Sequence, residues 1–102
     1  MARTRSIKPE FWSDEKMASV SREARLTFIG ILNLSDDYGA VRGHPAWLKN
    51  TIYPYDDIKP AEFKKWLDEL EKIHSLLPYE VEGEKYYYIR TFTKHQKINN
   101  PS

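Results

Sequence analysis

Cysteine is absent from this chain of 102 residues, so the sequence offers no disulfide, no thiolate metal ligand and no thiol nucleophile. Long apolar runs are also lacking, because the strongest one, residues 26–34, is too short to span a bilayer. The polar start, residues 1–8, has no apolar segment of the signal-peptide kind. We therefore expect a cytoplasmic protein that has no contact with a membrane.

Catalytic motifs are missing as well. His44, His74 and His95 are far apart in the sequence and lack the spacing of a metal-ligand set. There is no nucleophile motif and no phosphate-binding glycine loop. We therefore expect that the protein is not an enzyme and binds no cofactor.

Two acidic doublets, Asp36-Asp37 and Asp56-Asp57, are candidate ligands for a divalent cation. Both lie where helices are expected to end or begin, and Asp57 precedes a helix that is predicted to start near Pro60. Capping, with Asp57 as an N-cap, is therefore the interpretation that we favour over a metal site.

The residues that are present fit one globular domain over 1–102, since 40% are hydrophobic and 30% are charged. The net charge of +1 is unevenly distributed. Residues 1–8 and 85–97 are basic and contain no acid, whereas residues 56–84 contain nine acids and four lysines. The basic ends are either solvated or a footprint for nucleic acid, and the sequence leaves both interpretations open.

The first 20 residues are predicted to form an arm that packs on the core. Large apolar side chains are spaced through this polar segment, and the adjacent aromatics Phe11 and Trp12 are not typical of a free tail. Ser13 is predicted to cap a short helix over residues 14–18. At the other end, residues 91–102 are predicted to be a tail that leads to an absent linker.

Three longer helices are predicted from capping signals and apolar periodicity. Ser21 is a good N-cap for a buried helix over residues 24–34, which ends before a turn at Gly39. Pro45 fits the first position of a short second helix, and Pro60 fits the start of the third. The third helix has the strongest pattern, with apolar residues at i, i+3, i+4 and i+7.

Strand signals follow the first and third of these helices. A short strand is predicted at Ala40–Arg42, and a hairpin is predicted from Leu76–Val81 and residues 85–90, with Gly83 in the turn. Three consecutive tyrosines occupy the last strand, and alternation is expected to bury Tyr87 together with Ile89. Their outward rings either stack on a base, pack on another subunit or simply cover the hairpin.

The predicted order is therefore helix, short strand, helix, tight turn, helix and two-stranded hairpin, which is the order of a winged helix-turn-helix. The fold class is mainly α with a β-hairpin wing, in which three helices form the core beside a small antiparallel sheet.

Four stretches of the chain resemble the N-terminal domain of phage replisome organizer and replication-initiation proteins related to the DnaD primosomal family. They are SIKPEFWSDEKMASVSREARLTFIGILNLSDDYG (6–39), PAWLK with PYD (45–49 and 54–56), KWLDELE (65–71), and YEVEGEKYYYI with FTKHQKINNPS (79–89 and 92–102). In that family the winged-helix domain precedes a linker and a second helical domain, and the whole protein remodels origin DNA and recruits helicase. The resemblance also implies self-assembly. The sequence departs from the family pattern at His74, where glycine is expected, and at Lys59, where a serine-type N-cap is expected.

The candidate DNA-binding residues follow from charge and from their expected places in the fold. They are Arg3 and Arg5 in the arm, Lys59, Lys65 and Lys72 on the third helix, Lys85 at the hairpin tip, Arg90 at its base, and Lys94 and Lys97 in the tail. The outer face of the third helix mixes these lysines with acids, so this helix alone does not indicate DNA binding.

The function that we predict is weak, mostly phosphate-directed binding of duplex or single-stranded DNA by a phage-type replication initiation protein. The alternative is a protein-interaction or oligomerisation module that forms a homodimer or higher oligomer, or binds a helicase or primosome protein.

Overall fold

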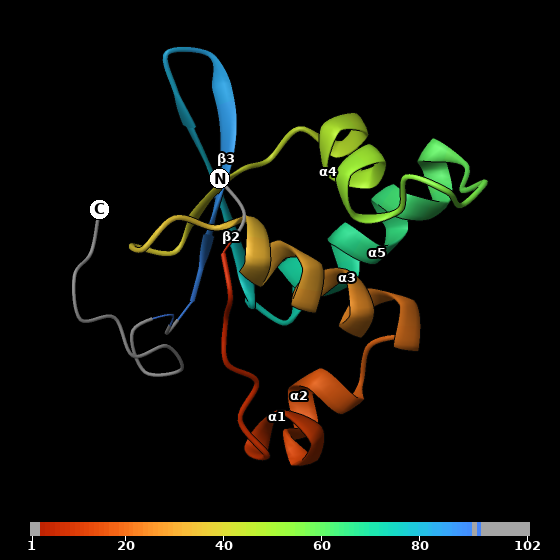
Figure 1. Cartoon of the computed structure of the whole chain (residues 1–102), viewed down its shortest axis with the longest axis vertical. Coiled ribbons are helices and arrows are strands. Elements are labelled where there is room, and N and C mark those ends of the chain that lie inside the picture. Colours follow the sequence, from red (N-terminus) through yellow and green to blue (C-terminus); the bar gives the residue numbers. More distant parts are fainter. Residues whose placement is uncertain (1–2, 91, 93–102) are drawn as a thin grey trace.

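The computed structural model describes residues 3–90 and 92 (Figure 1). The elements follow in the order α1 (Glu10–Ser13), α2 (Glu15–Ala18), α3 (Arg22–Leu34), β1 (Ala40–Arg42), α4 (Pro45–Ile52), α5 (Pro60–Lys72), β2 (Leu76–Val81) and β3 (Glu84–Ile89). The described part of the chain is thus a set of helices with one small antiparallel sheet, as predicted. The predicted tail, residues 91–102, lies outside the described residues except for Phe92, which is buried.

The arm packs on the core as predicted, but its second short helix begins at a different N-cap. The N-cap of α2 is Asp14 rather than Ser13, because the Asp14 carboxylate accepts hydrogen bonds from the backbone N–H groups of Lys16 and Met17 at 2.9 and 3.0 Å. Phe11 packs against the core, whereas its neighbour Trp12 is 66% exposed. Of the two adjacent aromatics, Phe11 is therefore the one that holds the arm to the core.

Helix α3 is the buried central helix that was predicted, and Ser21 is confirmed as its N-cap. The Ser21 hydroxyl oxygen accepts a hydrogen bond from the backbone N–H of Ala24 at 3.1 Å. The same hydroxyl donates to the carboxylate of Glu69 on α5 at 2.8 Å, and the backbone N–H of Ser21 donates to the other oxygen of that carboxylate. The cap therefore also fixes the start of α3 against α5.

Helices α4 and α5 both begin at a proline, as predicted. The N-cap position of α5 is Lys59, whose side chain makes no capping hydrogen bond, so the prediction that Asp57 caps this helix is wrong. At the other end, His74 has a positive φ of 61°, which is the conformation that glycine adopts most readily. Neither end of α5 thus has its most favourable residue.

The sheet has the strand order β1-β3-β2, and both pairings are antiparallel. Val81 pairs with Glu84, so the hairpin turn is Glu82-Gly83, and both residues have positive φ (52° and 81°). The last strand therefore begins and ends one residue earlier than the predicted range of 85–90.

The core lies between the helices and one face of this sheet (Figure 1). Strand alternation points Val41, Leu76, Tyr87 and Ile89 into it, and the burial of Tyr87 with Ile89 is confirmed. Helix α5 contributes a buried stripe, namely Phe63, Trp66, Leu67 and Leu70. None of the described helices has the length and apolar character needed to cross a bilayer.

Candidate nucleic-acid interface

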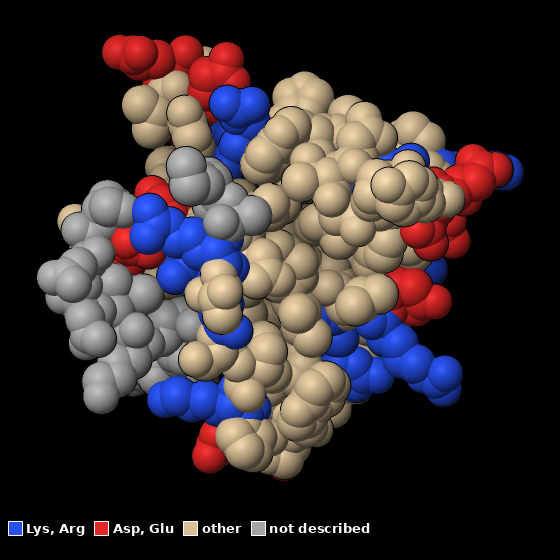
Figure 2. Space-filling view, viewed as in Figure 1, with Lys and Arg blue, Asp and Glu red and all other residues tan. Residues whose placement is uncertain are grey.

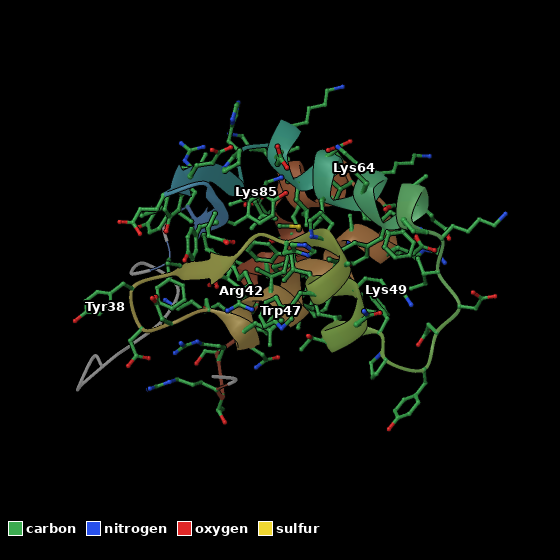
Figure 3. The ribbon with its side chains drawn as sticks, turned by 90° about the horizontal axis from the view of Figure 1, so that it is seen from above. Tyr38, Arg42, Trp47, Lys49, Lys64 and Lys85 are labelled. Atoms are coloured by element: carbon green, nitrogen blue, oxygen red, sulfur yellow. The ribbon has the colours of Figure 1, made fainter. Side chains whose placement is uncertain are left out.

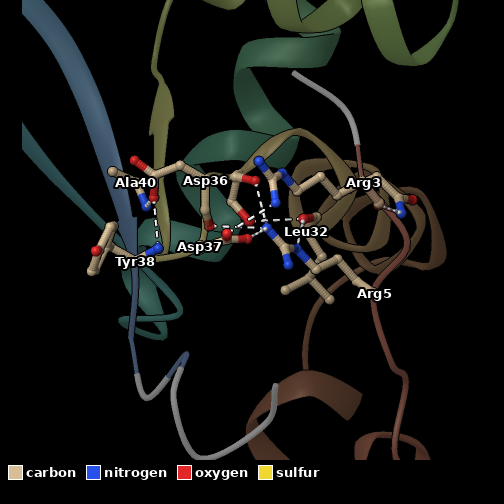
Figure 4. A network of polar contacts seen from close by, with 9 residues as sticks. Arg3, Arg5, Leu32, Asp36, Asp37, Tyr38 and Ala40 are labelled. Carbon is tan, nitrogen blue, oxygen red and sulfur yellow. Dashed lines mark hydrogen bonds and ion pairs between the residues drawn. The ribbon is translucent and has the colours of Figure 1, made fainter. Parts of the chain in front are cut away.

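The two arginines of the arm are bound to the protein itself (Figure 4). Arg3 and Arg5 form ion pairs with the two carboxylate oxygens of Asp37, at 2.9 and 3.3 Å. Arg5 also donates hydrogen bonds to the carbonyl oxygens of Leu32 in the last turn of α3 and of Ser35, its C-cap, at 3.2 and 2.8 Å. Its side chain is only 3% exposed. Arg5 is therefore not accessible to phosphate, and the expectation that it contacts DNA is corrected.

The acidic doublet Asp36-Asp37 follows α3, where one carboxylate orders the turn into β1 and the other binds the arm. Asp36 accepts hydrogen bonds from the backbone N–H groups of Tyr38 and Ala40, both at 2.9 Å, and so orders the turn into β1. Asp37 is 4% exposed and balances the two arginines. Among the described residues, no three histidine, aspartate or glutamate side chains come together as a metal site.

Lys85 does not lie at the hairpin tip, where it was expected. The tip is the turn Glu82-Gly83, and Glu80, Glu82 and Glu84 around it are all exposed, so the tip is acidic. The Nζ of Lys85 lies 3.8 Å from the Glu71 carboxylate on α5 and 4.8 Å from the centre of the Tyr87 ring. Lys85 thus faces α5, although its side chain is still 41% exposed.

The lysines of α5 are exposed, but they are not brought together. Lys59 and Lys72 lie at opposite ends of a helix that is roughly 20 Å long, at 1.5 Å per residue. Lys65 lies between them and is exposed, as are the acids Glu62 and Asp68 on the same helix. The mixed face that the sequence predicts is therefore present.

Of the three basic candidates near the end of the chain, Arg90 is among the described residues. Arg90 is exposed and lies one residue past β3, at the base of the hairpin. Its backbone N–H donates to the carbonyl oxygen of Ser75 at 3.2 Å. Lys94 and Lys97 lie outside the described residues.

The sequence reasoning missed two cations, Arg42 on β1 and Lys49 on α4, which are labelled in Figure 3. The guanidinium of Arg42 lies 5.3 Å from the centre of the Trp47 ring, which is a cation–π contact. In the described part of the chain, no carboxylate is within ion-pair distance of Arg42 or Lys49.

The topology explains where Arg42 lies. Arg42 is directly opposite Tyr86 in the β1–β3 pairing, and the backbone N–H of Gly43 donates to the carbonyl oxygen of Lys85 at 2.9 Å. Gly43 is closely packed here, because an added Cβ would lie 3.1 Å from the Lys85 side chain and 3.2 Å from the Tyr86 backbone. The end of β1 and Gly43 after it are thus held against the hairpin. Strand pairing is the signal that would have found Arg42.

A cavity of about 520 Å³ lies between the arm and the base of the sheet. Apolar side chains such as Phe11, Met17, Phe28 and Ile89 contribute to its lining, together with Lys8 and Arg90 at polar positions. Its lining also includes Glu10, Asp14, His74 and Ser75.

No family model, no curated protein and no solved structure matches this chain.

Proposed function

We propose that this chain is a winged helix-turn-helix domain that binds DNA as part of a phage-type replication initiation protein. What supports the fold assignment is the order α3, β1, α4, α5, β2 and β3, with β1 paired to the far strand of a hairpin. In winged helices the third core helix and the hairpin approach the duplex. The corresponding elements here are α5 and the β2–β3 hairpin.

The observation that carries the proposal is that Arg42 on β1 and Lys49 on α4, both labelled in Figure 3, form no ion pair with a described carboxylate. Their charges are not neutralised by a described carboxylate, so phosphate oxygens are available partners for them. The cation–π contact with Trp47 holds Arg42 without consuming its hydrogen-bond donors.

Binding through this surface is weak and mostly directed at phosphates. Lys64 is paired with Asp68 at 3.1 Å and Lys85 with Glu71 at 3.8 Å, so phosphates compete with protein carboxylates for these two lysines. Exposed ion pairs contribute at most about 1 kcal/mol, which allows such an exchange at low salt. The acidic hairpin tip repels phosphates and limits how deeply the hairpin enters a groove.

The phage replication context rests on the resemblance of the sequence to replisome organizer and DnaD-related proteins. The stretch of residues 6–39 covers the arm and α3, and residues 79–89 cover most of the hairpin. None of these stretches is a catalytic signature, and the proposal is accordingly a binding function.

The test is a matched pair of double variants in fluorescence anisotropy with short labelled duplex and single-stranded DNA at low salt. We expect Arg42→Ala with Lys49→Ala to weaken binding by about tenfold or more, because two phosphate contacts are lost. The control is Lys16→Ala with Arg22→Ala, which removes the same charge from α2 and the start of α3, at the end of the molecule away from the hairpin tip (Figure 1). Equal losses in the two double variants, or no binding by the unmodified chain, would contradict the proposal.

A second candidate function is a protein-interaction or oligomerisation module, with a helicase or primosome protein or a second copy as the partner. The observation that favours it is the hairpin, which carries exposed apolar side chains (Leu77, Tyr79 and Val81) and an acidic tip. Such a surface is better suited to protein than to phosphate. A stable complex with a protein partner that survives at high salt, in the absence of DNA binding, would favour this candidate.

A further inference from the structure

The sheet has a second face, on the side away from α3, α4 and α5 (Figure 1). Val41 and Tyr87 are cross-strand partners that are both buried in the core. Alternation along each strand therefore turns Arg42 and Tyr86, which are also cross-strand partners, to the outer face. Tyr86 is in turn directly opposite Tyr79 on β2. One arginine and two tyrosines, each from a different strand, thus form a line across the outer face.

The two tyrosines of this line are already ordered against each other. The rings of Tyr79 and Tyr86 stack with centroids 5.6 Å apart and an angle of 21° between the planes. Tyr79 is 39% exposed and lies on β2, at one edge of the described sheet. A ring pair that is held in place loses little conformational entropy when a further planar group stacks on it. The pair is therefore a preformed platform for an aromatic ligand.

Arg42 supplies a cation at the other end of the line. Its guanidinium lies 5.3 Å from the centre of the Trp47 ring in the first turn of α4, and Figure 3 shows the two side chains next to each other. This contact positions the guanidinium without using its N–H donors. No described carboxylate is within ion-pair distance of it, so those donors can bind a phosphate. Arg42 and Tyr79 are two strands apart, which separates their backbones by roughly 10 Å.

Acidic side chains lie on either side of this line. Glu84, nearer the hairpin turn, is on the same face as Tyr86, because two residues along a strand restore the direction of the side chain. Towards the base of the sheet, Asp36 precedes β1. Burial, followed by the charge of Asp36, raises the pKa of Tyr79 above its usual value of 10.0, so this carboxylate acts on the same rings. A chain of phosphates is therefore repelled along the hairpin and attracted at Arg42, which favours a path across the strands.

A ring platform beside an available cation discriminates between classes of ligand. In a duplex the bases stack on one another, so their faces are not available to a protein side chain. In a single strand each base has a free π-face and a phosphate beside it. An apolar protein surface would cover the rings but would leave Arg42 without an anion.

We propose that the outer face of the sheet binds single-stranded DNA, with a base stacked on the Tyr79–Tyr86 pair and a neighbouring phosphate bound by Arg42. The inference rests on the proposed DNA-binding function and names the form of DNA that this face binds. Every base has a π-face, so binding through this platform tolerates different sequences.

The test is fluorescence anisotropy at low salt with three labelled probes: a short single strand, the same strand as a duplex, and an abasic strand that keeps the phosphates and lacks the bases. We expect Tyr79→Leu, which keeps an apolar side chain but removes the ring, to weaken binding of the single strand by about tenfold. Its affinities for the duplex and the abasic strand are expected to change by less than about twofold, since neither presents a free base. Tyr79→Phe keeps the ring and is expected to restore most of the affinity for the single strand.

The matched control is Tyr55→Leu. Tyr55 is 97% exposed and lies between α4 and α5, away from the sheet (Figure 1). This variant is expected to bind all three probes as the unmodified chain does. Circular dichroism checks that each variant is folded.

The outcomes separate this inference from the function on which it rests. If Arg42→Ala weakens binding of every probe but Tyr79→Leu weakens none, the chain binds DNA and the stacking platform is wrong. Equal losses of Tyr79→Leu on the single strand and the abasic strand also contradict stacking. No binding of any probe by the unmodified chain contradicts both proposals. If Tyr79→Leu abolishes self-association in light scattering and leaves binding of the single strand unchanged, the occupant of this face is a second copy and the inference is wrong.

Discussion

Arg3 and Arg5 show how a charged residue can be misread from its sequence alone. Their position in a basic, acid-free segment makes them candidates for phosphate contact. The structure instead uses them to neutralise Asp37, a carboxylate that the turn after α3 buries. A buried carboxylate requires a counter-charge, and the sequence gives no sign that Asp37 rather than Asp36 is the buried member of the doublet.

Removal of the Asp37 charge is expected to destabilise the fold strongly. Asp37→Asn leaves the nearly inaccessible guanidinium of Arg5 without its counter-charge, and we expect the free energy of unfolding to fall by about 3 kcal/mol. Urea denaturation measures this change. The control is Asp68→Asn, which breaks the exposed pair with Lys64 and is expected to cost less than about 0.5 kcal/mol. Similar losses in both variants would show that the Asp37 cluster does not hold the arm.

Tyr87 is expected to make stability depend on alkaline pH. Burial, followed by the hydrogen bond to Glu71, raises the pKa of Tyr87 well above its usual value of 10.0. The folded state keeps the proton that the unfolded state releases, so the contribution of Tyr87 is complete below about pH 10 and is lost as the pH rises further.

Tyr87→Phe is therefore expected to lose stability less steeply than the unmodified chain above about pH 10, by up to about 1.4 kcal/mol per pH unit. The measurement is the free energy of unfolding in urea at a series of pH values. Tyr55→Phe is the matched control, because Tyr55 is 97% exposed, and its slope is expected to equal that of the unmodified chain. If the free energy of unfolding of Tyr87→Phe falls with pH as steeply as that of the control, the raised pKa of Tyr87 is not the cause of the alkaline loss of stability.

At the scale of elements, the signals that predicted the structure well are local ones. Ser21, Pro45 and Pro60 mark helix starts through their own backbone chemistry, and all three positions are confirmed. Competition between adjacent residues is harder to predict. Ser13 and Asp14 are both good caps, and the structure uses Asp14 because a separate turn of helix, α1, extends through Ser13.

Helix α5 is expected to gain stability from a better N-cap. Lys59 has the extended backbone of a cap (φ −69°, ψ 141°) but no side-chain hydrogen bond to the first turn. Lys59→Ser is expected to raise the free energy of unfolding by about 1 kcal/mol, measured by urea denaturation. Ser21→Ala, which removes the side-chain cap of α3, is expected to change stability in the opposite direction. If Lys59→Ser is instead less stable than the unmodified chain, the long side chain of Lys59 stabilises α5 by covering its first turn.

At the scale of the whole molecule, the candidate interface could not be predicted because it is assembled by topology. The sequence places Arg42 and Lys49 in a segment with no excess of positive charge. They become a candidate site because β1 pairs with the central strand β3 and α4 follows β1 after a short connection. Lys65 and Lys72, in contrast, were correctly predicted to be exposed, because their position opposite the apolar stripe of α5 is set by helical periodicity.

The central claim is that this surface binds DNA through its unpaired cations, and the salt dependence of binding tests it most directly. Anisotropy of the unmodified chain and of the Arg42→Ala, Lys49→Ala double variant, measured over a range of salt concentrations, gives the slope of log affinity against log salt. We expect a negative slope for the unmodified chain that is smaller by about two in the double variant on duplex DNA, since each lost phosphate contact removes about one unit. Equal slopes for the two proteins would contradict the account and place DNA contact, if any, elsewhere on the molecule.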